Sequence, residues 1–133
     1  MELTFASDPK NIHVVEDFII TLCEDNNISD DSVNGLMIAI TEAANNAMLH
    51  GNQSDPNKNV YIQSTVKGNE LIVAIKDQGK GFDPAKVPDP LAPENLLKTS
   101  GRGVFLMKEI MKTVDYQFTP QGTTVTLTFD ISK

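Results

Sequence analysis

The stretch Thr41-Glu42-Ala43-Ala44-Asn45-Asn46-Ala47-Met48-Leu49-His50-Gly51 decides how the rest of the chain is interpreted. Glu42, Asn46 and His50 are spaced four residues apart, so in a helix they lie along one side. At about 100° per residue, the opposite side carries an apolar stripe. That stripe comprises Val33, Leu36, Met37, Ile40, Ala44, Ala47 and Met48. The spacing therefore predicts an amphipathic helix with one polar face.

Two kinds of residue surround the polar face of this predicted helix. Gly35 and Ala39 share the face with Glu42 and leave room for a bulky group to approach. Ile38 and Leu49 border it, although apolar side chains gain little from contact with open water. A solvated helix face explains the E-x-x-x-N pattern equally well when the pattern is taken alone. Whether a site exists depends on what the rest of the chain supplies.

Composition restricts the class of protein. The chain has 133 residues, of which 40% are hydrophobic, and this suits one globular domain over residues 1–133. The net charge is −7 and the only arginine is Arg102. An acidic surface repels nucleic-acid phosphates and anionic lipid, so neither is an expected partner.

Three features favour a cytoplasmic protein. No apolar run approaches the ~18 residues that a membrane span needs. The first residues, Met1-Glu2-Leu3-Thr4-Phe5, lack the basic start of a signal peptide. The single cysteine, Cys23, permits no internal disulfide and falls on an apolar helix stripe, where a packed thiol is expected.

Hydrophobic periodicity and turn residues predict an alternation of strands and helices. A strand over 2–6 precedes a helix that starts at Asp8-Pro9, and a second helix starts at Ser29 or Asp30 and runs to His50-Gly51. The remaining elements are strands over 60–67 and 71–77, a helix from Gly101 to about Val114, a strand around Tyr116 and Phe118, and a strand over 123–131.

Two polar residues lie at strand ends on the side where the core forms. Asp77 alternates with Leu71, Val73 and Ile75, and Thr123 continues the apolar face of the last strand. A buried carboxylate is costly unless it accepts hydrogen bonds. We therefore expect Asp77 to have a partner.

Two glycine-rich segments flank a proline-rich one. Asp77-Gln78-Gly79-Lys80-Gly81 allows the backbone to approach a ligand closely. Residues 83–100 hold four of the seven prolines and are interpreted as a lid. Gly101-Arg102-Gly103 opens a helix, whose free amide groups and dipole favour an anion such as phosphate.

Over its whole length the chain resembles the GHKL (Bergerat-fold) ATPases, and within them the bacterial anti-sigma factor serine/threonine kinases. The segment 42–51 resembles the N-box of that family, 77–81 its first glycine box, 101–103 its second, and Gly122-Thr123 its closing strand. The resemblance implies an α/β two-layer sandwich, in which helices cover one face of a mixed, mostly antiparallel sheet.

The resemblance also implies ATP and Mg²⁺ as cofactors and assigns their contacts. Asp77 would accept the adenine amino hydrogen, with Thr123 and water alongside, and Gly79 and Gly81 would bend the chain around the nucleotide. Asn46 would hold the metal ion. The phosphates would be wrapped by the second glycine box, which consists of Gly101, Arg102 and Gly103.

Glu42 bears on the reaction. Histidine kinases usually carry asparagine at this place, whereas a serine hydroxyl or water benefits from a base. The resemblance thus implies a protein serine/threonine kinase that phosphorylates an anti-sigma-factor antagonist, sequesters a sigma factor, or does both, and that forms a homodimer. Two alternatives stay open: an ATP-binding module that sequesters its partner with little catalysis, and a histidine-kinase-like domain that serves a separate phosphoacceptor.

Overall fold

The computed structural model describes residues 1–79 and 99–131, and for residues 99–104 it describes the backbone only. The elements are β1 (Glu2–Ala6), η1 (Pro9–Asn11), α1 (Ile12–Asp25), α2 (Asp30–Asn46), η2 (Ala47–Gly51), β2 (Asn59–Lys67), β3 (Glu70–Lys76), α4 (Thr99–Ile110), β4 (Thr113–Thr119) and β5 (Gly122–Asp130). The predicted lid over 83–100 lies outside the described residues except for its last two positions, which belong to α4, and the glycine at position 81 also lies outside them.

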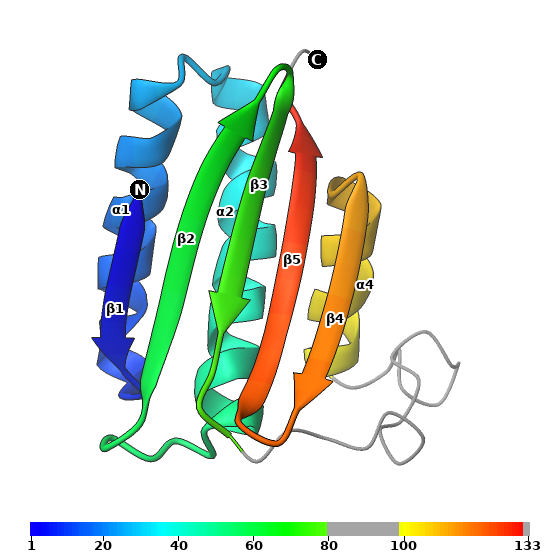
Figure 1. Cartoon of the computed structure of the whole chain (residues 1–133). Coiled ribbons are helices and arrows are strands. Elements are labelled where there is room, and N and C mark those ends of the chain that lie inside the picture. The colour runs from blue at the N-terminus through cyan, green and yellow to red at the C-terminus, as the bar shows by residue number, and fades with distance from the viewer. Residues whose placement is uncertain (80–98, 132–133) are drawn as a thin grey trace.

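The described strands form one sheet in the order β1-β2-β3-β5-β4, and α1, α2 and α4 cover one of its faces (Figure 1). This confirms the predicted two-layer sandwich. Every pairing between the described strands is antiparallel, so the expectation of a mixed sheet is corrected. β3 and β4 do run in the same direction, but β5 lies between them and is antiparallel to both.

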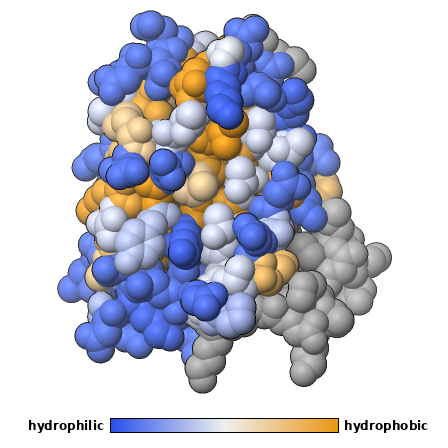
Figure 2. All heavy atoms as spheres, viewed as in Figure 1, coloured by the Kyte–Doolittle hydropathy of each residue, from blue (hydrophilic) through white to orange (hydrophobic). Residues whose placement is uncertain are grey.

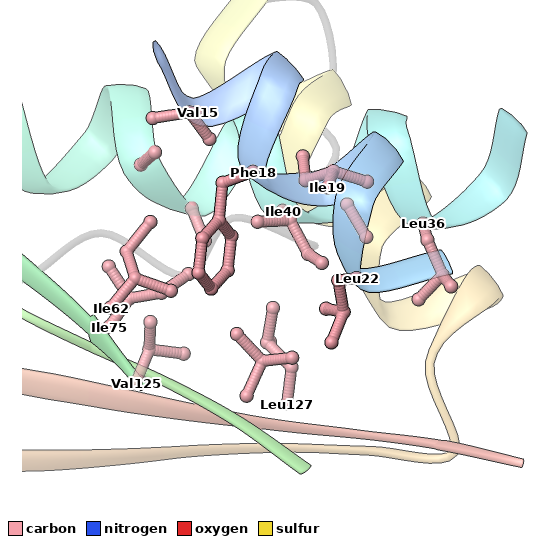
Figure 3. Packing of buried hydrophobic residues seen from close by; sticks show 14 of the residues in the cluster. Val15, Phe18, Ile19, Leu22, Leu36, Ile40, Ile62, Ile75, Val125 and Leu127 are labelled. Carbon is pink, nitrogen blue, oxygen red and sulfur yellow. The ribbon is translucent and has the colours of Figure 1, made fainter. Parts of the chain in front are cut away.

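The hydrophobic core fills the space between the helices and the sheet. Figure 3 shows side chains of α1 and α2 directed toward those of the strands. The fully buried members of the core include Val15, Ile19, Leu22, Leu36, Ile40, Ile62, Ile75 and Leu127. At about 1.5–3 kcal/mol for each large apolar side chain removed from water, this layer stabilises the fold and fixes the strand ends that carry the polar residues.

Both predicted helix starts are confirmed by their capping contacts. The Asp8 carboxylate accepts a hydrogen bond from the Lys10 backbone N–H at 3.0 Å, and Pro9 occupies the first position of η1. The Ser29 hydroxyl accepts from the Ser32 backbone N–H at 3.3 Å and caps α2. These caps satisfy N–H groups that have no partner inside the helix.

The second helix runs to Gly51 as predicted, but its winding changes after Asn46. In η2 the chain makes a wider π-helical turn, in which the Asn52 backbone N–H donates to the Ala47 carbonyl at 2.8 Å. Wide turns of this kind often occur at functional sites. Periodicity alone could not show it, because one such turn shifts the apolar pattern very little.

The small residues on the polar face of α2 are explained by α4. A Cβ atom added to Gly35 would lie 3.2 Å from Cγ2 of Ile110, and Ala39 is fully buried. The bulky group that these residues admit is therefore a neighbouring helix. Ile38 and Leu49 are each 45% exposed.

The other face of the sheet is not covered by any described element. Figure 2 shows apolar residues in the middle of this face, with hydrophilic residues around them. Ile72 and Ala74 of β3 point to this side, because the core-facing residues of the same strand alternate with them. In the described parts of the chain, no helix has both the length and the apolar character needed to span a membrane.

Candidate functional site

Asp77 lies just beyond the end of β3 and faces the core side, as predicted. It is 4% exposed, and it continues the alternation of the buried residues Leu71, Val73 and Ile75. Its Oδ1 atom accepts hydrogen bonds from the backbone N–H groups of Gly79 and Thr123, each at 3.0 Å. Two backbone donors hold this carboxylate in a single orientation.

Two polar atoms near Asp77 have no hydrogen-bond partner in the described part of the chain. Its Oδ2 atom accepts no hydrogen bond from the described residues. Thr123 is 6% exposed, and its Oγ1 atom is buried with no partner among the described residues. A buried polar group without a partner costs about 1–3 kcal/mol. Such groups are normally satisfied by water or a ligand, so an acceptor and a hydroxyl are available together here.

Three glycines surround the Asp77 carboxylate so closely that no side chain could replace their hydrogen atoms. An added Cβ would lie 2.0 Å from Asp77 Oδ2 at Gly51, 1.9 Å from the Gly51 carbonyl oxygen at Gly79, and 2.2 Å from the Asp77 carbonyl oxygen at Gly122. Gly122 also has a φ of +146°, which favours glycine. The sequence analysis assigned a role only to Gly79, because nothing local in the sequence shows that Gly51 and Gly122 meet Asp77.

We expect the Gly51→Ala variant to be clearly less stable than the wild type. Its methyl group would overlap Asp77 Oδ2, and overpacking of this kind costs about 1–3 kcal/mol. Urea unfolding followed by circular dichroism measures the change. Gly35→Ala is the matched control, since its methyl group would meet only the Cγ2 methyl group of Ile110, at 3.2 Å. Equal stability of Gly51→Ala and wild type would show that the chain around Asp77 is looser than the structure indicates.

Glu42 and Asn46 lie one turn apart on α2, where the Asn46 amide can donate toward the Glu42 carboxylate. Both residues are half-buried. Burial raises the pKa of the Glu42 carboxyl above its usual value, and the hydrogen bond from Asn46 opposes that shift. A carboxylate with a raised pKa is a stronger base than an ordinary surface glutamate.

Tyr116 is a neighbour of Glu42 that the sequence analysis did not single out. It is paired with Val125 across the sheet and so faces the helix layer. Partial burial, and next the negative charge of Glu42, raise the pKa of the Tyr116 phenol, although the residue is 40% exposed. Its ring stacks on Phe118 with 5.9 Å between the ring centroids. Alternation along the strand predicts which face these rings occupy but not their distance from α2.

The second glycine box lies in the first turns of α4. The helix begins at Thr99, two residues before the predicted start at Gly101. The first four N–H groups of a helix have no partner within it, so the backbone is suited to an anion at this place. The contacts assigned to Gly101, Arg102 and Gly103 stay predictions.

The described residues contain no group of three or more His, Cys, Asp or Glu side chains arranged to hold a metal ion. Mg²⁺ is often bound through one or two protein oxygens together with substrate phosphates. The side-chain oxygen of Asn46 offers such a ligand. Its role as the metal ligand stays a prediction.

Asn52 is a second residue that sequence reasoning missed. It is fully buried and follows Gly51 directly, between the predicted helix that ends at Gly51 and the predicted strand over 60–67. Its Oδ1 atom accepts a hydrogen bond from the Gln78 backbone N–H at 2.7 Å. The residue is linked in this way to the segment that carries Asp77, although 25 positions separate it from Asp77.

Comparison with known families gives one match that covers nearly the whole chain. Residues 5–129 match the histidine kinase-like ATPase domain. The match includes Glu42, Asn46, Asp77 and Thr123.

Several curated proteins are similar in sequence. The anti-sigma F factor of Oceanobacillus iheyensis is 28% identical, over 100% of this chain and 93% of its own length. The anti-sigma F factor of Anoxybacillus flavithermus is 33% identical over 77% of this chain and 73% of its own. The serine-protein kinase RsbW of Bacillus licheniformis is 28% identical over 96% of this chain and 83% of its own.

Solved structures support the fold. The RsbU and RsbW domains of a Mycobacterium tuberculosis protein superpose with a TM-score of 0.70 and 16% identity, over 98% of this chain and 31% of that one. The histidine kinase domain of a blue-light activated kinase from Erythrobacter litoralis gives a TM-score of 0.57 and 19% identity, over 76% of this chain and 45% of that one. At these identities the likeness concerns the fold alone.

Proposed function

The chain belongs to the histidine kinase-like ATPase domain family, and on that premise we propose that it is an ATP-dependent protein serine/threonine kinase of the anti-sigma factor type. Curated relatives named anti-sigma F factor and serine-protein kinase support a role in anti-sigma regulation. The finer assignment, which includes catalysis, rests on the site.

The arrangement around Asp77 carries the proposal. Oδ1 is fixed by two backbone donors, Oδ2 accepts nothing from the described residues, and the Thr123 hydroxyl is buried without a partner. The edge of adenine offers an amino donor beside a ring acceptor. Asp77 would accept from the amino group, and Thr123 would bond to the ring nitrogen directly or through water. Gly51 and Gly79 let the backbone pack closely around the Asp77 carboxylate and so hold it in place.

The phosphate groups of ATP would extend toward the start of α4, where the free backbone N–H groups and the positive end of the helix dipole stabilise negative charge. Arg102 would add the one guanidinium of the chain. Mg²⁺, held by Asn46 and the phosphates, would offset the remaining charge in a protein whose net charge is −7.

Glu42 would take the proton from the attacking serine hydroxyl. Its half-buried position raises its pKa, which strengthens it as a base, and the neighbouring Asn46 amide opposes that shift. Ile38 lies one turn before Glu42 on α2, and Leu49 lies in η2. A protein acceptor that reaches Glu42 would cover these two exposed side chains.

The acceptor we propose is an anti-sigma-factor antagonist, and a sigma factor is the second proposed partner. Most of the similar curated proteins named above carry only the name anti-sigma F factor, and this observation favours a different function. A regulator that binds ATP and sequesters its partner with little catalysis is therefore the second candidate. Glu42 argues against a histidine-kinase-like domain, because a neutral imidazole needs no base.

The proposal is tested in two steps. Calorimetric titration with ATP, with and without Mg²⁺, measures binding, and tight binding that requires Mg²⁺ is expected. Proteins that copurify with the chain from its native host are then incubated with it and radiolabelled ATP. An acid-stable label on a copurified protein supports the kinase. A partner that stays bound and unlabelled would favour the sequestering regulator.

The homodimer that the resemblance implies is also proposed. We expect light scattering to give about twice the chain mass of 14.6 kDa at micromolar concentration with nucleotide present. Ile72 and Ala74, on the uncovered face of the sheet, give a surface through which two copies could associate. A monomer under these conditions would contradict the prediction.

A further inference from the structure

Asn52 connects four separate segments of the chain at one buried point. It is 0% exposed, and its Nδ2 atom donates to Ser7 Oγ at 2.7 Å and to the Asn59 carbonyl at 3.0 Å. Its Oδ1 atom accepts from the Gln78 backbone N–H at 2.7 Å. The side chain of Asn52 therefore uses both amide protons and its oxygen. A buried network in which every member is satisfied rigidifies its surroundings.

The same residue fixes both sides of the Asp77 pocket. Its chain neighbour Gly51 lies against Asp77 Oδ2, and its partner Gln78 is the chain neighbour of Asp77. The Gln78 side chain returns to the same point, where its Oε1 atom accepts from the Asn59 backbone N–H at 2.6 Å. Asn52 thereby sets the position of the carboxylate relative to Gly51, although it does not touch the pocket itself.

We propose that Asn52 is a positioning residue that determines how well the pocket selects adenine, by holding the Asp77–Gly79 turn against Gly51. This inference rests on the proposed function, since it takes Asp77 to be the acceptor for the adenine amino group. Nothing in the motifs assigned from sequence gives position 52 a role.

The test compares two nucleotides that differ only in the group that Asp77 would recognise. ATP carries the 6-amino group, and purine riboside triphosphate lacks it. The ratio of their affinities, measured by calorimetry, reports the contact at Asp77 and cancels any general loosening of the fold. We expect Asn52→Ala to lower this ratio about tenfold, because a hydrogen bond to a charged group contributes roughly 10- to 100-fold in affinity.

Two further variants separate positioning from general stability. Asn52→Asp keeps an acceptor for the Gln78 N–H but loses both donors, so it should unfold more easily than the wild type. Its affinity ratio should nevertheless stay closer to that of the wild type than the ratio of Asn52→Ala. Ser7→Ala removes one acceptor of the Asn52 amide and leaves the Gln78 contact in place, so its ratio should match that of the wild type. Faster hydrogen exchange of the Gln78 amide in unliganded Asn52→Ala should accompany the change.

The outcomes distinguish this inference from the proposed function. A wild type that binds both nucleotides equally would overturn the adenine assignment, and the role of Asn52 with it. A wild type that prefers ATP, beside an Asn52→Ala variant that weakens both nucleotides by the same factor, would overturn the positioning role alone. A lowered ratio in Asn52→Ala that Asn52→Asp partly restores would establish it.

Discussion

Replacing Asp77 by asparagine should nearly abolish ATP binding while leaving the fold intact. The amide oxygen can still accept from the backbone N–H groups of Gly79 and Thr123, which hold Oδ1 at 3.0 Å in the wild type. That constraint places the amide nitrogen where Oδ2 lies, so a donor would face the adenine amino group. The lost bond alone accounts for about 10- to 100-fold in affinity, and the two opposed donors add to it.

Calorimetric titration with ATP and Mg²⁺ measures this effect, and the unfolding transition in urea shows whether the variant is folded. Asp17→Asn is the matched control, since it makes the same change of charge on the exposed surface of α1. Its affinity should equal that of the wild type. If Asp77→Asn bound ATP as tightly as Asp17→Asn, adenine could not be recognised by this carboxylate.

The sequence was sufficient to predict the parts of the site that depend on local spacing. The three-four periodicity placed Glu42 and Asn46 together on α2, and strand alternation turned Asp77 and Thr123 toward the core. Both are properties of a single element. The helix starts at Asp8 and Ser29 could be predicted for the same reason, because a capping side chain bonds only to the first turn of its own helix.

The parts that were missed depend on contacts between distant segments. Gly51 meets Asp77 only because η2 takes a wide turn, and Asn52 reaches Gln78 across the start of β2. The face of α2 that seemed open to a ligand at Gly35 is occupied by Ile110 of α4. The resemblance implied a mixed, mostly antiparallel sheet, and the described strands are all antiparallel because β5 lies between β3 and β4; strand order of this kind is a matter of topology and leaves no trace in local spacing.

Replacing Glu42 by glutamine should separate binding from chemistry. Glutamine keeps an oxygen that can accept the hydrogen bond from Asn46, so the shape of the site and its affinity for ATP should survive. Because burial raises the pKa of Glu42 in the folded state, ionisation of this carboxyl is disfavoured there. The free energy of unfolding therefore falls as the pH rises above the pKa that Glu42 has in the unfolded chain. The glutamine variant should therefore be at least as stable as the wild type at neutral pH.

Phosphoryl transfer to the acceptor should fall by roughly 10²- to 10⁴-fold in this variant, the usual contribution of a positioned general base. This loss in rate is smaller than the loss expected when a covalent catalyst is removed, since positioning and charge stabilisation account for most of the acceleration of phosphoryl transfer. In the wild type the rate should rise with pH as the Glu42 carboxyl loses its proton, at a pH above the usual range for glutamate. Glu42→Gln should lack that rise, whereas the exposed surface variant Glu24→Gln should keep both the rate and the pH profile.

The assay uses radiolabelled ATP and the copurified acceptor, and it is read before and after an acid wash. A phosphate ester on serine or threonine withstands acid, whereas phosphohistidine does not. Full activity in Glu42→Gln would show that Glu42 is not the base. An acid-labile label would show that the protein is a histidine-kinase-like domain and not a serine kinase. Because ATP affinity is measured on the same variants, a loss of transfer with unchanged binding can come only from the chemical step or from the placement of the acceptor. The wild-type pH profile bears on the same point, since a rate that did not rise as the Glu42 carboxyl loses its proton would count against Glu42 as the base.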